Sequence, residues 1–338
     1  MNGPTIADAV EVAGRIVRDH IALQPGEEVV IIADSYTDRD MLYALCGQIA
    51  ACGAEYTLVM QRARIRQEDT HKLTRAVKAV YGECDVVIPA TGSCGVSQYA
   101  ASPILWPLMA EKRVRVFTLS ERSLQELTSG GALADYSQVE RVGQALLEVL
   151  QGASAVRITS ALGTDLTVGI RNCEWDNLAS FARRPGDEGG LPSGEVCADP
   201  RAESAEGVIV VDGPIGYVGM PESLIRVRAH RGKWVEVHGD SDAATKLRGL
   251  FTRVENATNV AEIAFGTNPM ARRSGVVSEE KKRAGSAHLA FGRSNKGADW
   301  TYRVPCTIHG DMVLREVTVE VDGAEVVRDG QLLVGQRT

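Results

Sequence analysis

The sequence predicts an α/β protein in which an N-terminal domain with a doubly wound parallel sheet precedes a β-rich α+β domain. Up to about residue 151, short apolar runs alternate with segments of helical periodicity, the pattern of βαβ units. From residue 152 onward, short β-branched runs follow one another between Gly and Asp residues. We therefore expect two domains, residues 1–151 and 152–338.

The N-terminal half begins with a helix and then alternates strands and helices. Apolar residues recur at helical spacing over 5–20, and Pro25-Gly26 turns the chain into the apolar run 28–33. Asp34-Ser35 is the predicted N-cap of a helix that runs to Cys52. The remaining predicted elements are a strand at 55–60, a helix at 68–81, strands at 85–89 and 113–118, and a helix at 138–151. Strands joined in this way form a parallel sheet with right-handed crossovers.

Two loops, 33–35 and 91–95, follow the carboxyl ends of predicted strands. Ligands bind at that edge of parallel sheets, which makes the two loops a candidate nucleotide site. Neither loop contains the Gly-x-Gly-x-x-Gly fingerprint or a Gly-Lys-Ser/Thr phosphate loop. We interpret their Gly and Ser as ordinary turn residues.

The C-terminal half is predicted to consist mainly of strands. The strands are expected at 155–159, 165–168, 208–211, 224–228, 234–237 and 304–313, with a hairpin-like run over 328–334 and helices at 241–256 and 278–283. The polar segment 183–190 indicates either a flexible loop or lid, or a plain solvated connection. The pattern leaves both interpretations open.

Composition excludes several classes of function. A net charge of −7 argues against nucleic acid, which is bound mainly through clustered Lys and Arg. No window approaches the roughly 18 apolar residues of a membrane span, and the N-terminus lacks a basic segment followed by an apolar one. The seven cysteines contain no Cys-x-x-Cys pair, which is typical of reduced thiols. We therefore expect a cytoplasmic protein that binds neither membrane nor nucleic acid.

Two imidazoles and three carboxylates in the C-terminal two fifths form a candidate metal site. His309 and Asp311 are two residues apart, so on a strand both side chains leave the same face. His288 lies about twenty residues earlier. Glu195 and Glu262 stand among apolar or turn residues, and a buried carboxylate needs a partner such as a cation. Each residue alone is more often structural, but together these donors suit Zn, Mn, Co or Fe(II).

Other histidines lack such support. Their surroundings are polar or amphipathic, and we interpret them as surface or packing residues: His20, His71, His230 and His238.

Six motifs in order resemble the aminopeptidase T (thermophilic leucyl aminopeptidase) metallopeptidase family. They are Gly163-Thr-Asp-Leu-Thr167, Leu191-Pro-Ser-Gly-Glu-Val196, Ala261-Glu-Ile-Ala-Phe-Gly-Thr-Asn-Pro269, His288-Leu-Ala-Phe-Gly292, His309-Gly-Asp311 and Arg328-Asp-Gly-Gln-Leu-Leu-Val334. The resemblance implies a homodimer and a hydrolytic centre with one or two metal ions, held by Glu195, Glu262, His288, His309 and Asp311. The family's active-site tyrosine falls at Asn295, and Tyr302 is the candidate substitute.

A second resemblance is to the branch of this scaffold that contains 2,5-dihydroxypyridine 5,6-dioxygenase, an iron enzyme. It rests on the segment 192–207 and on Pro305-Cys306 just before the His-x-Asp pair. The resemblance implies iron held by two His and one Asp, and the first of these His would fall at Glu262.

From these features we expect a metal-dependent hydrolase. It would cleave a C–N bond, amide or amino, of a small anionic or heterocyclic substrate with metal-activated water. Glu195 is the first candidate for the general base and Glu262 the second, while Arg184, Arg293 and Tyr302 are the candidate substrate-binding residues. The alternatives are an Fe(II)-dependent dioxygenase that cleaves a 2,5-dihydroxypyridine-like ring, a leucyl-type aminopeptidase, and a metal-stabilised binding protein without turnover.

Overall fold

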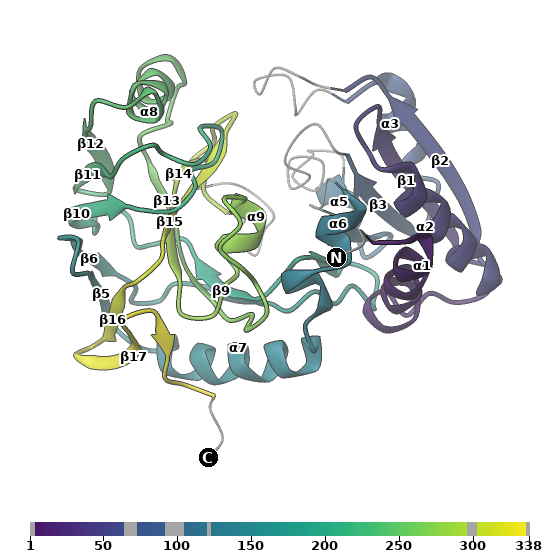
Figure 1. The fold of residues 1–338 in the computed structure, drawn as a ribbon, viewed down its shortest axis with the longest axis horizontal. Helices are drawn as coiled ribbons and strands as arrows, with labels where there is room; N and C mark the ends of the chain where they lie inside the picture. Colours follow the sequence, from purple (N-terminus) through teal and green to yellow (C-terminus); the bar gives the residue numbers. More distant parts are fainter. Residues whose placement is uncertain (1–3, 64–72, 92–104, 120–122, 296–302, 336–338) are drawn as a thin grey trace. The chain divides into compact units, whose positions relative to one another are not determined.

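The computed structural model describes residues 4–63, 73–91, 105–119, 123–295 and 303–335 (Figure 1). The chain divides into two compact units, Met1–Leu133 with Ser180–Ser193, and Ala134–Ala179 with Gly194–Thr338. This division differs from the predicted boundary at 151 in two segments: the helix before residue 151 belongs to the second unit, and 180–193 returns to the first. Predictions for 68–72, for 92–95, and for His71 and Tyr302 lie outside the described residues.

The first unit is built on a five-stranded sheet in the order β2-β1-β3-β4-β8, and each neighbouring pair is parallel. Its strands are β1 (Glu28–Asp34), β2 (Glu55–Gln61), β3 (Val86–Ala90), β4 (Arg115–Leu119) and β8 (Glu188–Leu191). The central strands β1 and β3 are almost entirely buried, as their continuous apolar runs require. The predicted parallel sheet is confirmed.

Helices connect these strands. They are α1 (Ile6–Arg15), which continues as a π-helical turn over Ile16–His20, α2 (Arg39–Ala51), α3 (Arg75–Val80), α5 (Leu105–Ala110), α6 (Leu124–Leu127) and a 3-10 turn at Gly130–Leu133. The start of α2 was predicted wrongly: Asp38 rather than Asp34-Ser35 is its N-cap, and the Asp38 carboxylate accepts hydrogen bonds from the backbone of Asp40 (3.0 Å) and Met41 (3.2 Å). Asp34 is instead the buried last residue of β1.

The segment predicted as a lid or a solvated connection ends in the edge strand β8. Its residues pair in parallel with β4, from Val116 opposite Glu188 to Leu119 opposite Leu191. A β-carbon at Gly189 or Gly190 would overlap neighbouring backbone or side-chain atoms. The two glycines therefore let β8 approach its neighbours closely, whereas the sequence pattern indicated only a flexible or solvated segment.

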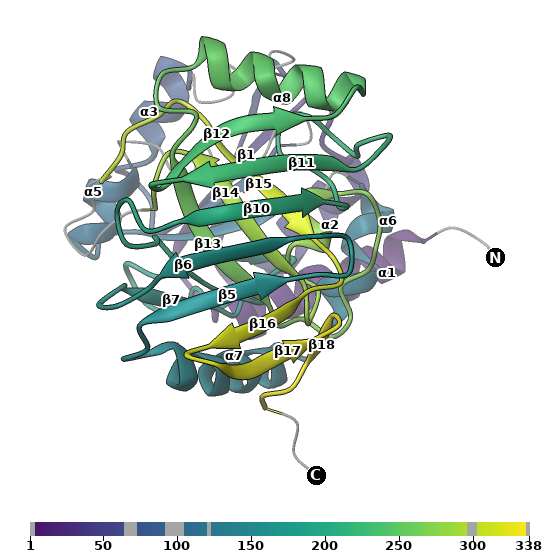
Figure 2. The same ribbon diagram turned by 90° about the vertical axis from the view of Figure 1, so that its left-hand side faces the viewer.

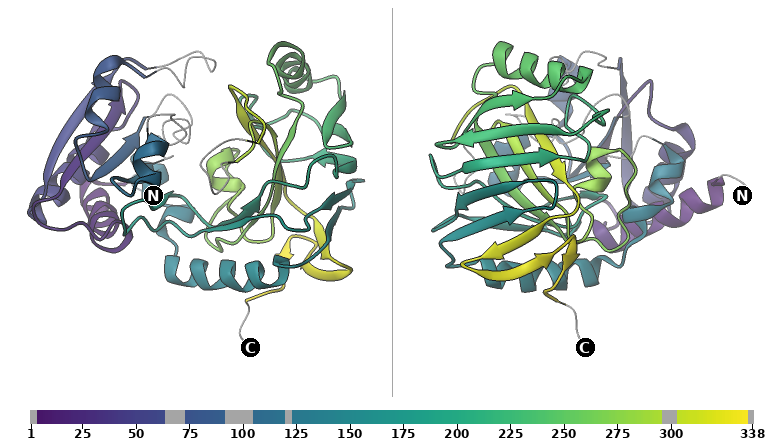
Figure 3. Two further views of the ribbon diagram at one scale, coloured as in Figure 1. Left: turned by 180° about the vertical axis from the view of Figure 1, so that it is seen from behind. Right: turned by 60° about the vertical axis from the view of Figure 1, so that its left-hand side comes forward.

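The second unit contains two antiparallel sheets that lie as two layers (Figures 2 and 3). The eight-stranded sheet, called sheet B, has the order β12 (Lys233–His238), β11 (Ile225–His230), β10 (Glu206–Val211), β6 (Asp165–Gly169), β5 (Ala155–Thr159), β16 (Thr318–Val321), β17 (Ala324–Arg328), β18 (Gln331–Leu332). The five-stranded sheet, called sheet C, has the order β15 (His309–Leu314), β14 (Ala287–Gly292), β13 (Val260–Gly266), β9 (Glu195–Ala198), β7 (Trp175–Leu178). The predicted change to a β-rich texture after residue 151 is confirmed.

Three helices belong to this unit. They are α7 (Tyr136–Leu150), α8 (Asp242–Arg253) and α9 (Val277–Glu280). α7 packs against β7 and β9, and α8 packs against β12 at one edge of sheet B (Figure 2). No helix among the described residues is both long and apolar enough to cross a membrane.

The core of the second unit includes apolar residues of both sheets. Ile158 and Val168 of sheet B belong to one buried cluster with Ile263, Leu289 and Met312 of sheet C. Because side chains alternate along a strand, the residues between these in sheet C leave the opposite face. That second face of sheet C carries the polar residues described below.

Candidate metal centre

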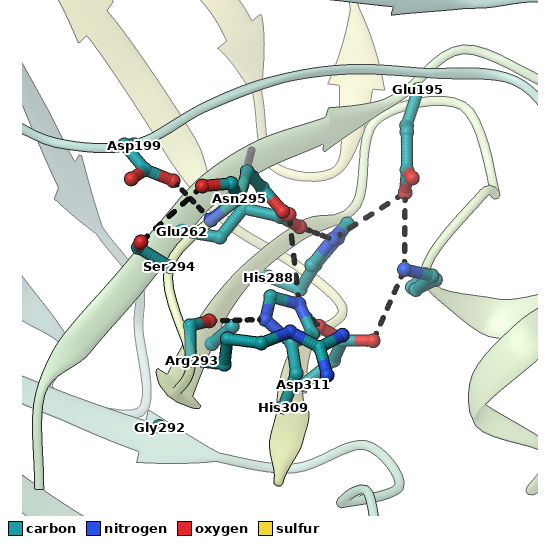
Figure 4. A network of polar contacts seen from close by, with 12 residues as sticks. Glu195, Asp199, Glu262, His288, Gly292, Arg293, Ser294, Asn295, His309 and Asp311 are labelled. Atoms are coloured by element: carbon teal, nitrogen blue, oxygen red, sulfur yellow. Dashed lines mark hydrogen bonds and ion pairs between the residues drawn. The ribbon is translucent and has the colours of Figure 1, made fainter. Parts of the chain in front are cut away.

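All five predicted ligands come from four adjacent strands of sheet C. Glu195 lies on β9, Glu262 on β13, His288 on β14, and His309 and Asp311 on β15. Glu195, Glu262 and His288 are almost completely buried, and Asp311 is 7% exposed. Their side chains lie in one polar network (Figure 4).

The pairing register explains why these side chains meet. Glu262 pairs with Ala290, and Ala290 pairs in turn with Asp311. Gly292 pairs with His309. Because directly paired residues point to the same side of a sheet, the polar side chains share one face. The small residues between them leave space above that face.

A β-bulge turns Glu262 toward this face. The register shifts between Val260 and Glu262, so Ala261 is an extra residue in β13. Val260 and Ile263 both belong to the buried core, although they are three residues apart. Without the bulge, Glu262 would share the core side with Val260, where a carboxylate has no polar partner.

Glu262, His309 and Asp311 form the closest group. One donor atom of each lies within 4.8 Å of the others. His309 Nε2 is 3.6 Å from Glu262 Oε2 and 3.4 Å from Asp311 Oδ1. His309 Nδ1 lies 2.6 Å from the backbone oxygen of Arg293, which can only accept, so Nδ1 carries a proton and directs Nε2 toward the carboxylates.

The charges of this group favour a cation. Burial lowers the pKa of His309, but its contact with Asp311, whose Oδ1 lies 3.4 Å from Nε2, and the charge of Glu262 outweigh burial and raise the pKa. The imidazole therefore attracts a positive charge, which a metal ion at Nε2 supplies in place of a proton. Asp311 Oδ1 is buried and accepts no hydrogen bond from the described residues. These donors fit a divalent cation.

His288 and Glu195 extend the network on the β9 side. His288 Nε2 is 2.9 Å from Glu262 Oε1 and 3.4 Å from Glu195 Oε2. His288 Nδ1 and Glu195 Oε2 are buried and have no hydrogen-bond partner among the described residues. The structure thus brings all five predicted ligands together, and their binding of metal stays a prediction.

Two lysines that sequence reasoning missed complete the network. Lys281 Nζ lies 3.1 Å from Asp311 Oδ2 and 3.6 Å from Glu195 Oε2, and Lys282 Nζ forms an ion pair with Glu195 Oε1. The charged run 279–283 has the composition of a solvated helix, yet the side chains of Lys281 and Lys282 are only 17% and 10% exposed. The only signal in the sequence was its position just before the His288 motif.

The lysines keep the buried carboxylates ionised. Burial acts to raise the pKa of Glu195, but the charges of Lys281 and Lys282 hold it below its usual value. Burial opposes ionisation of Asp311 as well, and Lys281 with His309 holds that pKa well below its usual range. For Glu262, burial is outweighed by the hydrogen bond with His288 and nearby positive charges, which lower the pKa to about 2.

Asn295 contacts the Glu262 oxygen that points away from His288, and Asp199 contacts Asn295 in turn. Asp199 was not identified from the sequence. The Asn295 side chain donates to Glu262 Oε2 at 2.7 Å, and its backbone N–H donates to Asp199 Oδ1 at 2.7 Å. Arg303 Nη2 lies 3.6 Å from Asp199 Oδ2. Burial raises the pKa of Asp199 to about 6. Asn295 thus fixes one oxygen of Glu262.

The three predicted substrate-binding residues fall in different places. Arg293 follows β14 and contacts the centre through its backbone oxygen (Figure 4). Arg184 belongs to the first unit, where its side chain is 87% exposed and its Nε lies 3.8 Å from Asp187 Oδ2. Tyr302 lies outside the described residues. Their contacts with a substrate stay predictions.

Residues 16–334, nearly the whole chain, match the sequence family of 2,5-dihydroxypyridine 5,6-dioxygenase. The chain belongs to this family. A solved structure of 2,5-dihydroxypyridine dioxygenase from Pseudomonas putida KT2440 is similar with a TM-score of 0.76 and 18% identity, covering 98% of each chain. The structure of wild-type AmpT from Thermus thermophilus is similar with a TM-score of 0.73 and 19% identity, covering 97% of this chain and 99% of that one. No curated protein matches significantly.

The family match confirms the resemblance to the dioxygenase branch. The similarity to AmpT shows that the chain shares the fold of that protein, as the first resemblance implies. The two solved structures confirm the mixed α/β fold class. Family membership supports an enzyme, but it favours the dioxygenase alternative over the predicted hydrolase. The hydrolase type is therefore not confirmed.

Proposed function

We propose that this enzyme is a metal-dependent dioxygenase that opens a small hydroxylated heteroaromatic ring of the 2,5-dihydroxypyridine type. The observation that carries the proposal is the close group of Glu262, His309 and Asp311, in a chain whose family model is that of such a dioxygenase. In the reaction one ring C–C bond breaks and both atoms of O₂ enter the product.

The donor set suits this chemistry. Two imidazoles and one carboxylate on one face of the ion are the usual ligands of non-haem Fe(II) oxygenases, which keep other positions open. Glu262, His309 and Asp311 would hold the ion. Fe(II), when bound, supplies the redox chemistry that lets O₂ react with an aromatic ring. This chain departs from the two-His set that the resemblance implies, because Glu262 is a carboxylate.

The net charge of the residues around this group favours an anionic substrate ring. The buried carboxylates Glu195, Glu262 and Asp311 face the ammonium groups of Lys281 and Lys282, so these side chains together carry one negative charge. One divalent ion makes the centre positive, and a deprotonated hydroxyl of the substrate then restores neutrality. An anionic substrate is therefore bound more favourably than a neutral one.

A specific observation also favours a second candidate, hydrolysis by metal-activated water. Glu195 Oε2 is buried and accepts no hydrogen bond from the described residues. Beside a metal-bound water it would act as the general base, which contributes typically about 10²–10⁴-fold to a rate. In this alternative the lysine contacts of Glu195 hold the carboxylate ionised for proton transfer.

Turnover with and without air tests the proposal. The protein, purified without chelator and loaded anaerobically with Fe(II), is mixed with 2,5-dihydroxypyridine, and loss of the aromatic absorbance is followed. We expect rapid loss in air and none under argon. Equal rates under argon and air, on this ring or on an amide-bearing analogue, would replace the dioxygenase with the hydrolase.

A further inference from the structure

We infer that Lys281 takes the place of a second metal ion, so that the centre holds one divalent cation per chain. The inference rests on the metal centre of the proposed function, but not on the reaction with O₂. It concerns a residue that neither the motifs nor the comparisons single out.

The position of the ammonium group carries the inference. Lys281 Nζ lies between two carboxylates, 3.1 Å from Asp311 Oδ2 and 3.6 Å from Glu195 Oε2. Asp311 thus turns one oxygen toward Lys281 and the other toward His309. In a two-metal site, a carboxylate shared in this way bridges two cations. Here one of the two cations is an ammonium group.

The remaining side chains would form the second site if the ammonium group of Lys281 were absent. Glu195 Oε2 and Glu262 Oε1 lie 3.4 Å and 2.9 Å from His288 Nε2, on the side of the network away from His309. Carboxylates and an imidazole at such separations are suitable metal donors. Lys281 therefore blocks a set of donors that is otherwise present.

The protein holds Lys281 rigidly. Its backbone N–H donates to the oxygen of Val277 in α9, and the preceding residue Glu280 accepts two hydrogen bonds from Arg315, at 2.8 and 2.9 Å. Arg315 directly follows β15, the strand of Asp311. The segment with Lys281 and the strand with Asp311 are thus linked by a second ion pair, in which the Glu280 side chain is 1% exposed. A mobile surface lysine would not stay between two carboxylates.

Charge also limits the number of ions. With both lysines protonated, the side chains around the centre carry one negative charge, which one divalent ion already exceeds. A second divalent ion would leave three uncompensated positive charges in a buried site, which is strongly unfavourable. Removing the charge of Lys281 relieves this repulsion and exposes Glu195.

Metal stoichiometry tests the inference with Mn(II) as the probe. The full chain, stripped of metal and dialysed against Mn(II), is analysed for moles of manganese per mole of protein, and spin coupling between ions is read by electron paramagnetic resonance. We expect one ion in the wild type and in K281R, and two coupled ions in K281M. The double variant K281M/E195Q should return to one ion. K246M, at an exposed lysine of α8, is the matched control and should bind one ion.

Two results would overturn the inference: two ions in the wild type, or a folded K281M that still binds one. If K281M does not fold, the single variant E195Q is measured instead. The inference predicts that E195Q keeps one ion per chain. Loss of an ion from E195Q would show that Glu195 is a ligand. A lack of O₂ uptake would count against the proposed dioxygenase alone, since the stoichiometry is measured without substrate.

Discussion

Glu262 and Asp311 stand on opposite sides of Ala290, and each pairs with it across sheet C. The carboxylates of two non-adjacent strands can approach one cation only because the side chain between them is a single methyl group. Sheet C thus provides both the donors and the space between them.

Enlarging this methyl group should weaken metal binding. In Ala290→Val the added methyl groups fill the space between Glu262 and Asp311, and we expect at least a tenfold loss of Mn(II) affinity, with roughly 1–3 kcal/mol of overpacking. Ile263→Val, on the core side of the neighbouring strand, is the control: it costs about 1 kcal/mol of stability and should leave the affinity unchanged. Titration calorimetry measures the Mn(II) affinity of the two variants. Equal affinities in a folded Ala290→Val would show that the ion binds elsewhere.

Removal of a predicted ligand should remove the ion. His309→Ala and Asp311→Ala each leave two members of the closest group, so we expect metal content and activity to fall together. His230→Ala is the control, because His230 is exposed at the end of β11 in sheet B, where its Nδ1 lies 3.1 Å from Glu206 Oε2. Elemental analysis after dialysis gives the result. Full metal content in either variant would exclude His309 or Asp311 as a ligand.

The sequence predicted part of the elements and singled out five side chains that the structure brings together. Regular apolar runs predicted β1, β3 and β5 closely, and the His-x-Asp spacing predicted that His309 and Asp311 share a face. These features depend on local periodicity, which a sequence displays directly.

Other features depend on tertiary contacts that periodicity does not display. The bulge at Ala261 reverses the alternation of β13 and is invisible in a run that is apolar on both faces. Lys281 belongs to a charged run that sequence patterns assign to solvent, and only the fold encloses it. The Gly-rich β8 lacks β-branched residues and is a strand only because it pairs with β4.

The ion pair of Glu280 with Arg315 should stabilise the segment that carries Lys281. Glu280 is 1% exposed and also accepts from the backbone of Gly275 at 2.6 Å, so Glu280→Gln should lower the free energy of unfolding by roughly 2 kcal/mol. Glu325→Gln, in an exposed pair with Arg328, is the control and should change it by less than about 1 kcal/mol. Urea unfolding measures both. Similar small effects would mean that the pair does not hold this segment.

His20 should make the first unit less stable in acid. Its ring stacks on Phe181 and its Nδ1 lies 2.9 Å from Ser180 Oγ, and burial, with Arg15 and Arg183 nearby, lowers its pKa to about 3. Well above pH 6.5 the imidazole is neutral in both states and contributes no pH dependence. As the pH falls from there toward 3, the unfolded chain takes up a proton that the folded chain does not, so stability decreases with falling pH.

Substitution isolates this contribution. Between pH 7.5 and 5.5, wild-type protein should lose about 1.4 kcal/mol more unfolding free energy than His20→Gln, which cannot take up a proton. Identical pH dependence in His20→Gln and the wild type would show that His20 titrates equally in both states.

The source of the oxygen atoms in the product tests the proposed function most directly. The Fe(II)-loaded enzyme is given 2,5-dihydroxypyridine under ¹⁸O₂ in ordinary water, and in parallel under ordinary O₂ in labelled water, with the product analysed by mass spectrometry. A ring-cleaving dioxygenase places two labelled atoms from ¹⁸O₂ in the product and consumes one O₂ per substrate. A single labelled atom from water, with no O₂ consumed, would contradict the account and establish hydrolysis instead.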